Sequence, residues 1–294
     1  MMEDTCAVAE FRTCLLCGSS RHRSVFQEFG IDILRCRDCG HIFSSYAANP
    51  HHDEFWGEEV VQDEHFYWNR ARARMHEDFF RRFLVGRAGR LLDVGCGLGY
   101  FLKAMAGFDT WEAYGYEVSP AAVRYARETL GHTNVRCGRP EEAEFPPGSI
   151  DIITMWDVME HFLQPDPLLR RCHALLRVGG ICFIYTPNVH LQFVRARVLR
   201  LLLGMRHGVA YLQARDHLHH YSTSSIRRLL ERNGFSHVEY IHLHPVQSIS
   251  GSKSGLLRWI KNAWFEAARA VSVVSGGFLN FDNLFVVARK DSRV

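Results

Sequence analysis

Three glycines alternate along a short stretch that directly follows an apolar run. Residues 90–94 are mostly apolar and include Asp93, and Gly95, Gly97 and Gly99 come next. This order predicts a buried strand, a turn in which Cβ atoms would obstruct a ligand, and a helix whose N-terminus faces that ligand. The spacing G-x-G-x-G, with Asp93 two residues ahead, differs from the G-x-G-x-x-G of dinucleotide-binding turns.

A carboxylate stands at the end of the next expected strand. Glu117 closes residues 112–117 and lies 22 residues after Gly95. An acidic side chain at this place suits the two hydroxyls of a ribose. The glycine turn and Glu117 together predict a nucleotide site.

Several motifs resemble those of class I S-adenosylmethionine-dependent methyltransferases, over roughly residues 89–294. The resemblance implies a Rossmann-like α/β fold, with six parallel strands and one antiparallel strand, and S-adenosylmethionine as the cofactor. It does not specify the substrate. The motifs are Asp93-Val-Gly-Cys-Gly-Leu-Gly, Tyr116-Glu117-Val118-Ser119, Asp157-Val-Met-Glu160-His161, Leu176-Arg-Val-Gly179-Gly180 and Thr186-Pro187-Asn188.

The chemistry of S-adenosylmethionine assigns roles to these residues. Backbone N–H groups of the glycine turn would approach the carboxylate of the methionine moiety, Asp93 would accept from its ammonium, and Glu117 would take the ribose hydroxyls. Many members of the class carry an acidic residue after the third strand, whereas this chain has Gly138-Arg139, so we expect backbone groups there to read the adenine. The cofactor-binding candidates are Asp93, Gly95, Cys96, Gly97, Glu117, Val118, Arg139 and Asp157.

Histidines are the candidates for acid–base work. Methyl transfer is an in-line displacement from a sulfonium, which is already a good leaving group, so the protein mainly aligns the acceptor and removes a proton. A base that titrates near neutral pH suits that task. We expect His161, which follows the fourth strand, to be this base, with His217 and His220 as the next candidates, although a structural role at a helix start suits His161 equally well.

Four cysteines near the N-terminus have the spacing of a metal site. Cys14 and Cys17 form one C-x2-C pair, Cys36 and Cys39 form another, and a glycine follows each pair directly. Two such turns presenting four thiolates predict a closed, tetrahedral and structural zinc site of the zinc-ribbon type. With no open position on the ion, this zinc should not take part in the reaction.

The remaining chain must hold these residues in place, and its pattern alternates between strands and helices. Such alternation predicts a parallel sheet covered by helices on both faces, with ligands at the carboxyl ends of the strands. We expect strands at 90–94, 112–117, 135–137, 150–156, 181–186, 238–242 and 282–289, and helices at 66–85, 99–106, 119–130, 166–176 and 223–233.

The expected organisation is a zinc-ribbon-like module with four cysteines (1–46), a linker with a helix (47–88) and the methyltransferase domain (89–294). Two insertions, 189–221 and 245–281, interrupt the last of these. The sequence leaves three interpretations of them open: a substrate lid, a contact between subunits, or an amphipathic helix on a membrane surface.

Composition sets broad limits on partners and location. The 294 residues are 47% hydrophobic and 23% charged, with a net charge of +3, which gives no strong nucleic-acid signal. No apolar run is long enough to span a membrane, and no secretory signal pattern is seen, so we expect a cytoplasmic location.

We therefore predict an enzyme that transfers a methyl group to a small-molecule acceptor, preferably at oxygen, with a sugar, a glycan or another biosynthetic intermediate as the substrate. Two alternatives remain. One is an RNA methyltransferase that uses the zinc module for RNA recognition. The other is a non-catalytic scaffold that binds S-adenosylmethionine.

Overall fold

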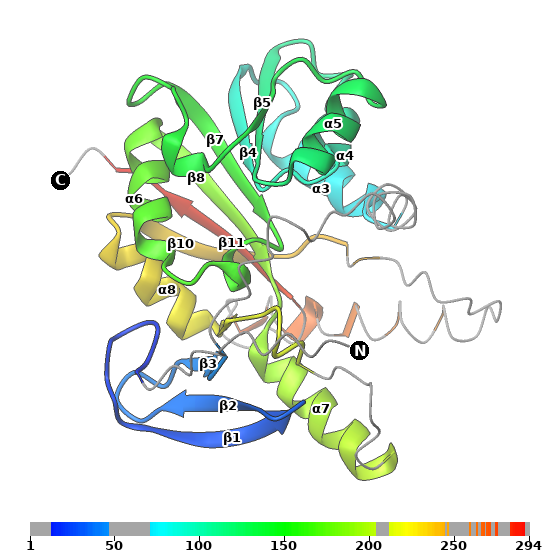
Figure 1. Cartoon of the computed structure of the whole chain (residues 1–294). Coiled ribbons are helices and arrows are strands. Elements are labelled where there is room, and N and C mark those ends of the chain that lie inside the picture. Colours follow the sequence, from blue (N-terminus) through cyan, green and yellow to red (C-terminus); the bar gives the residue numbers. More distant parts are fainter. Residues whose placement is uncertain are drawn as a thin grey trace, which may run out of the picture.

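The computed structural model describes residues 13–46, 71–203, 212–244 and 283–291, together with Val246 and several positions between 259 and 275. The described strands form two sheets, one of seven strands and one of four. The larger sheet lies above the smaller one in Figure 1.

The seven-stranded sheet has the order β10-β11-β8-β7-β4-β5-β6. Only β11 runs antiparallel to its neighbours, so the predicted six parallel strands and one antiparallel strand are confirmed. The strands are β4 (Gly89–Val94), β5 (Trp111–Glu117), β6 (Val135–Cys137), β7 (Ile150–Trp156), β8 (Leu176–Thr186), β10 (Ser236–Ile241) and β11 (Leu284–Arg289).

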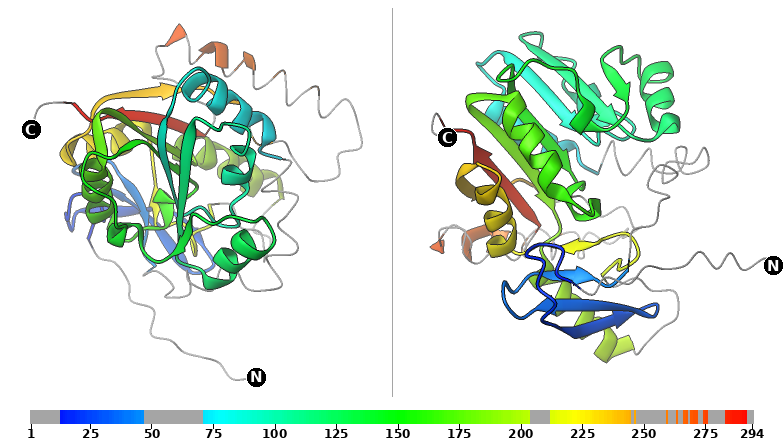
Figure 2. Two further views of the ribbon diagram at one scale, coloured as in Figure 1. Left: turned by 90° about the horizontal axis from the view of Figure 1, so that it is seen from above. Right: turned by 60° about the vertical axis from the view of Figure 1, so that its left-hand side comes forward.

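Helices cover both faces of this sheet, as the alternation predicts. One face packs against α6 (Pro165–Leu175) and α8 (Thr223–Arg232). The other packs against α3 (Ala73–Phe83), α4 (Tyr100–Ala104) and α5 (Pro120–Glu128). Figure 2 shows the two groups of helices on opposite sides of the strands. Burial of apolar side chains on both faces accounts for the nearly continuous apolar sequence of the central strands.

Local signals account for where helices α5 and α8 begin. Ser119 is the N-cap of α5 and accepts a hydrogen bond from the N–H of Ala122, and Pro120 occupies the first turn. Helix α8 begins with a capping box in which Ser222 and Ser225 bind each other's backbone N–H groups. These contacts satisfy N–H groups that a helix leaves unpaired at its start.

The four-stranded sheet has the order β1-β2-β3-β9 and is antiparallel throughout. Its first three strands, β1 (His22–Glu28), β2 (Ile31–Cys36) and β3 (Ile42–Ser44), come from the N-terminal segment. Its fourth strand, β9 (His219–His220), comes from the first insertion of the large domain. The short strands β3 and β9 have no clear sequence signal, because two or three residues show no periodicity.

The small sheet packs tightly on the rest of the chain. Helix α7 (Val189–Leu203) lies along it, and its Val189, Phe193 and Ala196 join a cluster with Phe26 and Ile33. The cysteine-bearing turns share the apolar core of α6 and α8. The predicted division of the chain near residue 46 stays a prediction, but the two parts have a common interior.

The first insertion is only partly helical in the described residues: α7 ends at Leu203, and residues 212–221 approach the small sheet in extended and turn conformations. Most of the second insertion, 245–281, lies outside the described residues. A lid, a subunit contact and a membrane-surface helix all stay predictions for it. Among the helices that the structure describes, none has the length and apolar character to cross a membrane.

Candidate active site

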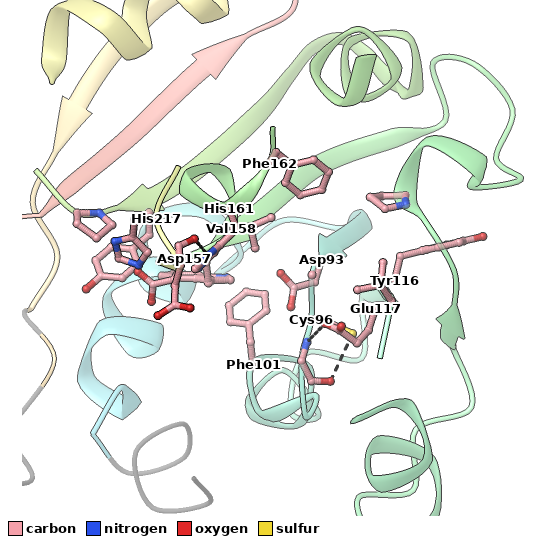
Figure 3. Close-up of a pocket in the computed structure, with 18 of the residues that line it drawn as sticks. Asp93, Cys96, Phe101, Tyr116, Glu117, Asp157, Val158, His161, Phe162 and His217 are labelled. Atoms are coloured by element: carbon pink, nitrogen blue, oxygen red, sulfur yellow. Dashed lines mark hydrogen bonds between the residues drawn. The ribbon is translucent and has the colours of Figure 1, made fainter. Parts of the chain in front are cut away.

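A cavity of about 1430 Å³ opens at the carboxyl ends of β4, β5, β7 and β8. Its walls come from the glycine turn, from the segments that follow those strands, and from the first insertion. Figure 3 shows Asp93, Cys96 and Glu117 on one side of the cavity and Asp157, His161 and His217 on the other. This volume exceeds that of a typical pocket for one small ligand, so it leaves room for two reactants.

The glycine turn has the conformation that its sequence predicts. Gly95 and Gly97 have φ angles of +67° and +52°, which side chains with a Cβ rarely adopt. A Cβ on Gly95 would lie 2.7 Å from Cγ2 of Val158. The turn therefore brings main-chain atoms to the cavity wall at a place where a side chain would not fit. Cys96 also lines this wall.

Glu117 lies at the tip of β5 and faces the cavity, as predicted. Its Oε2 accepts a hydrogen bond from the N–H of Gly97 at 2.8 Å, and its Oε1 accepts one from the N–H of Ser119 at 2.9 Å. The side chain is only 6% exposed. These two bonds fix the carboxylate beside the glycine turn, where its remaining lone pairs can accept ligand hydroxyls.

Asp93 is buried next to the same turn and accepts a hydrogen bond from Thr154 Oγ1 at 2.7 Å. Burial raises the pKa of Asp93 to about 8, and the neighbouring Glu117 also acts to raise it, whereas the Thr154 bond acts in the opposite direction. A cationic group in the cavity would favour the ionised form of Asp93.

The part of the cavity where we expect the adenine departs in part from the sequence-based prediction. Val118 and Arg139 line it as predicted. However, the N–H of Gly138 donates to the carbonyl oxygen of Glu117 at 3.0 Å, so this backbone group already has a protein partner. Glu141 and Glu142 follow in the short 3₁₀ helix η2 (Pro140–Glu142), and both line the cavity. The cavity wall near Gly138-Arg139 therefore carries two acidic side chains.

Asp157 follows β7, lines the cavity and pairs with Arg72. Its φ of +52° is unusual for a residue other than glycine, and such conformations gather at functional sites. Burial raises the pKa of Asp157, while the Arg72 guanidinium acts to lower it. Arg72 and His76 both line the cavity. The sequence did not single them out, because only tertiary contacts bring this segment to the strand ends.

His161 and His217 line the far side of the cavity, and the buried Glu160 lies next to them. A carboxylate oxygen and one ring nitrogen from each histidine lie within 4.8 Å of one another. His161 Nδ1 donates to the carbonyl oxygen of Asp216 at 2.8 Å. Glu160 is buried in the short helix η3 (Met159–His161), and Thr186 donates to its Oε2 at 2.9 Å. Burial raises the pKa of Glu160 well above its usual range, and Asp157 adds to this effect.

The structure places His220 apart from the other two candidate bases. This residue lies in β9 and is not part of the cavity wall. Its ring is buried, and burial lowers its pKa to about 3. The ring lies behind the wall, and its lowered pKa makes it a weak base, so both its position and its basicity favour His161 and His217 over His220.

The four N-terminal cysteines converge in space. Cys14 Sγ lies 3.6 Å from Cys39 Sγ, Cys17 Sγ lies 3.6 Å from Cys36 Sγ, and all four sulfur atoms lie within 4.8 Å of one another. Sulfur atoms around a tetrahedral zinc ion, with Zn–S bonds of about 2.3 Å, are separated by about 3.8 Å. The donor set and its spacing therefore fit a structural zinc ion.

Comparison with known families identifies the class of protein. A family model described as a methyltransferase domain matches residues 67–240, which is more than half of the chain. The chain therefore belongs to this family, and its sheet order and glycine turn are those of a class I S-adenosylmethionine-dependent methyltransferase.

Two curated relatives agree with this classification. The chain is 31% identical over 182 residues to a ubiquinone biosynthesis O-methyltransferase from Bordetella avium, a match that spans 58% of this chain and 73% of the relative. It is 30% identical over 123 residues to a probable S-adenosylmethionine-dependent methyltransferase from Mycolicibacterium smegmatis, spanning 42% of this chain and 46% of that protein. The matched region is thus less than half of the second relative.

Solved structures share the fold at low sequence identity. Phosphoethanolamine N-methyltransferase 2 from Haemonchus contortus, in complex with phosphomonomethylethanolamine and S-adenosylhomocysteine, aligns with a TM-score of 0.54 and 15% identity over 85% of this chain and 63% of that chain. The complex between the Trm112 methyltransferase activator and a putative methyltransferase from Haloferax volcanii gives a TM-score of 0.55 at 15% identity, covering 83% of this chain and 100% of the matched chain.

Proposed function

We propose that this methyltransferase transfers the methyl group of S-adenosylmethionine to a hydroxyl oxygen of a small molecule. The observation that carries the proposal is one continuous cavity that runs from the glycine turn and Glu117 to His161 and His217. The relatives named as O-methyltransferases support oxygen as the accepting atom. In its narrower form, the proposal names a nucleotide-linked sugar or a glycan as the acceptor.

The chain's own residues divide the binding of the cofactor among them. The main chain of the glycine turn borders the carboxylate end of the methionine moiety, while the N–H groups of Gly95, Cys96 and Gly97 donate to Tyr116 and Glu117. Asp93 receives the ammonium of the methionine moiety. Glu117 accepts from the ribose hydroxyls, and Val118 with Arg139 borders the adenine. Asp157, held by Arg72, borders the opposite end of the cofactor. When bound, S-adenosylmethionine supplies a methyl group on a positively charged sulfur.

The acceptor occupies the side of the cavity formed by the first insertion. Leu191, Gln192, Gln213 and His217 all line the cavity there, which favours the substrate-wall interpretation of residues 189–221. His161 carries a proton on Nδ1, because that atom donates to a carbonyl oxygen, so the neutral form of the ring has its lone pair on Nε2. Its Nε2 therefore carries the lone pair needed on the acceptor side.

The four-cysteine site has a structural role in this proposal. A zinc ion held by Cys14, Cys17, Cys36 and Cys39 stabilises the turns that begin the N-terminal sheet. Helix α8 supports the same turns, since Arg228 donates to the carbonyl oxygen of Cys39 at 2.8 Å.

Substitution of Glu117 tests the cofactor assignment. Glu117→Ala removes the acceptor of the ribose hydroxyls and also leaves the N–H groups of Gly97 and Ser119 without their carboxylate partner. We expect calorimetry to show binding of S-adenosylmethionine to the wild type and binding at least about tenfold weaker in the variant. Glu117→Gln, which keeps one acceptor oxygen, should be intermediate. A wild type that binds no S-adenosylmethionine would contradict the proposal.

A second candidate function is methylation of RNA, and one observation favours it. Arg23, Arg35 and Arg37 line a shallow hollow on the N-terminal sheet, and Arg23 and Arg35 are register partners on β1 and β2. Like charges opposite each other on a sheet repel, so an anion there would be stabilising. A salt-dependent gel shift with RNA, lost in Arg35→Gln, would support this candidate.

A further inference from the structure

Three side chains at the acceptor side of the cavity are not used by cofactor binding, and together they form a set of metal ligands: His161 and His217 line the cavity, and Glu160 is buried beside them. Glu160 and His161 lie in η3, directly after β7, and His217 comes from the first insertion. One ligand atom from each lies within 4.8 Å of the other two. Two imidazoles and one carboxylate are a donor set that divalent transition-metal ions prefer, and they leave coordination positions open.

Glu160 is the strongest indication of a ligand. It is only 1% exposed, and Thr186 holds one of its oxygens, Oε2. Its other oxygen, Oε1, is buried and has no hydrogen-bond partner among the residues that the structure describes. A buried carboxylate oxygen without a partner carries a free-energy cost, and a bound cation would remove that cost.

His161 is oriented as metal ligands usually are, and His217 lies beside it. The Nδ1–H of His161 donates to the Asp216 carbonyl, which fixes the ring and leaves the lone pair on Nε2. The ring centroids of His161 and His217 are 4.9 Å apart, and the rings are nearly perpendicular. The backbone carbonyl of His217 accepts from Ser44 Oγ at 2.9 Å, so the N-terminal sheet holds this residue in place.

The spacing and the charges fit a single ion. Nitrogen and oxygen ligands bound to one ion at about 2.1 Å lie about 3 to 3.5 Å apart, so small side-chain rotations would close the present triad. The nearby Arg72 does not oppose a cation strongly, because Asp157 neutralises it. In Figure 3, His161 and His217 lie next to Asp157, on the opposite side of the cavity from Glu117.

We propose that Glu160, His161 and His217 bind a divalent transition-metal ion, which in turn binds the hydroxyl oxygen of the acceptor. This inference rests on the proposed function for its chemistry. A coordinated hydroxyl has a lowered pKa and loses its proton to water. The oxygen then forms a bond to the methyl carbon, the C–S bond breaks, and its electron pair remains on sulfur. The two histidines thus act as ligands rather than as the base.

Binding of Mn²⁺ alone tests the site without an acceptor. The full chain, with zinc confirmed at one ion per chain, is titrated with Mn²⁺ and the free ion is measured by electron paramagnetic resonance. We expect the wild type to bind one Mn²⁺ per chain. Because the loss of a group that merely hydrogen-bonds to a metal ligand already weakens metal binding about 10- to 100-fold, Glu160→Gln and His217→Ala should bind at least about 100-fold more weakly.

The matched control is His237→Asn, which changes a histidine that is 71% exposed on β10 and does not line the cavity. It should bind Mn²⁺ as the wild type does. The thermal shift that S-adenosylmethionine produces is measured on every variant, which shows whether each one folds and whether the cofactor site is intact. Glu160→Gln retains the shape of the side chain and an oxygen for Thr186, so it serves if His217→Ala does not fold.

Two results would overturn the inference: a wild type that binds no Mn²⁺ beyond its zinc, or variants that bind Mn²⁺ as tightly as the wild type. Failure of the proposed function looks different, because the wild type would then show no thermal shift with S-adenosylmethionine, whatever its binding of Mn²⁺.

Discussion

Ser44 connects the N-terminal sheet to the active site, and its substitution tests that connection. The hydroxyl of Ser44 is buried and lies 2.9 Å from the carbonyl oxygens of both Ala214 and His217. It has one hydrogen to share between them. Ser44→Ala leaves both carbonyls without this donor while creating only a very small cavity.

The contacts of Ser44 set the expected loss of stability and of turnover in Ser44→Ala. Removing a side-chain donor from a buried carbonyl costs about 1–3 kcal/mol. A change of about 1 kcal/mol lowers the melting temperature of a domain of roughly 150–250 residues by about 2–4 °C, so we expect a decrease of about 2–12 °C. Because His217 shifts with its carbonyl, and a misplacement of about 1 Å can cost about 100-fold in rate, kcat should fall about 10- to 100-fold.

The assay compares three quantities in Ser44→Ala and in a matched control. Ser45→Ala removes a similarly buried hydroxyl from the next residue, but that hydroxyl accepts from the N–H of Asp32 rather than donating to the His217 segment. Differential scanning fluorimetry gives the melting temperature, calorimetry the affinity for S-adenosylmethionine, and turnover with the acceptor gives kcat.

We expect both variants to bind S-adenosylmethionine within about twofold of the wild type, because the cofactor residues share no partner with Ser44. Only Ser44→Ala should lose turnover. Equal turnover in the two variants would refute the argument that the N-terminal sheet positions the acceptor side of the cavity.

Two further predictions concern the cofactor and the zinc. Because the pKa of Asp93 is about 8 in the free protein, and an α-ammonium group titrates near about 7.8, the affinity for S-adenosylmethionine should rise about fivefold between about pH 6.5 and 7.5 as Asp93 ionises. Calorimetry at the two pH values checks this, and the rise should disappear in Asp93→Asn. Cys36→Ser should lose zinc and disorder the N-terminal sheet; elemental analysis and proteolysis check this, and a wild type purified without stoichiometric zinc would contradict it.

The sequence was sufficient for the features that are local in the chain. Gly95 and Glu117 could be interpreted because each stands at the end of an expected strand, and the carboxyl ends of parallel strands lie at one edge of the sheet. Ser119 marked the start of α5 for an equally local reason. The four cysteines form two C-x2-C pairs, so their spacing in the sequence was enough to predict a metal site.

The sequence was insufficient where distant segments meet. Arg72 belongs to a segment whose contact with Asp157 depends on how α3 packs, and no local pattern announces it. His217 and His220 are three residues apart, and both were predicted as candidate bases. Only His217 lines the cavity. The two-residue strand β9 decides this difference, because its pairing with β3 directs His220 toward Ser44.

Hydrogen bonds from the N-terminal sheet to residues 214–217 explain how the four-cysteine module and the cavity can depend on each other. Glu28 of β1 accepts from the N–H of Ala214 at 2.8 Å, and Ser44 of β3 bonds to the carbonyl of His217. The N-terminal sheet thus holds both ends of the turn at residues 214–217. Loss of zinc would remove the support of this turn, and the turn is separate from the cofactor residues. The chain would then retain its nucleotide site and lose the acceptor side, so the effect of zinc should appear in turnover before it appears in cofactor binding.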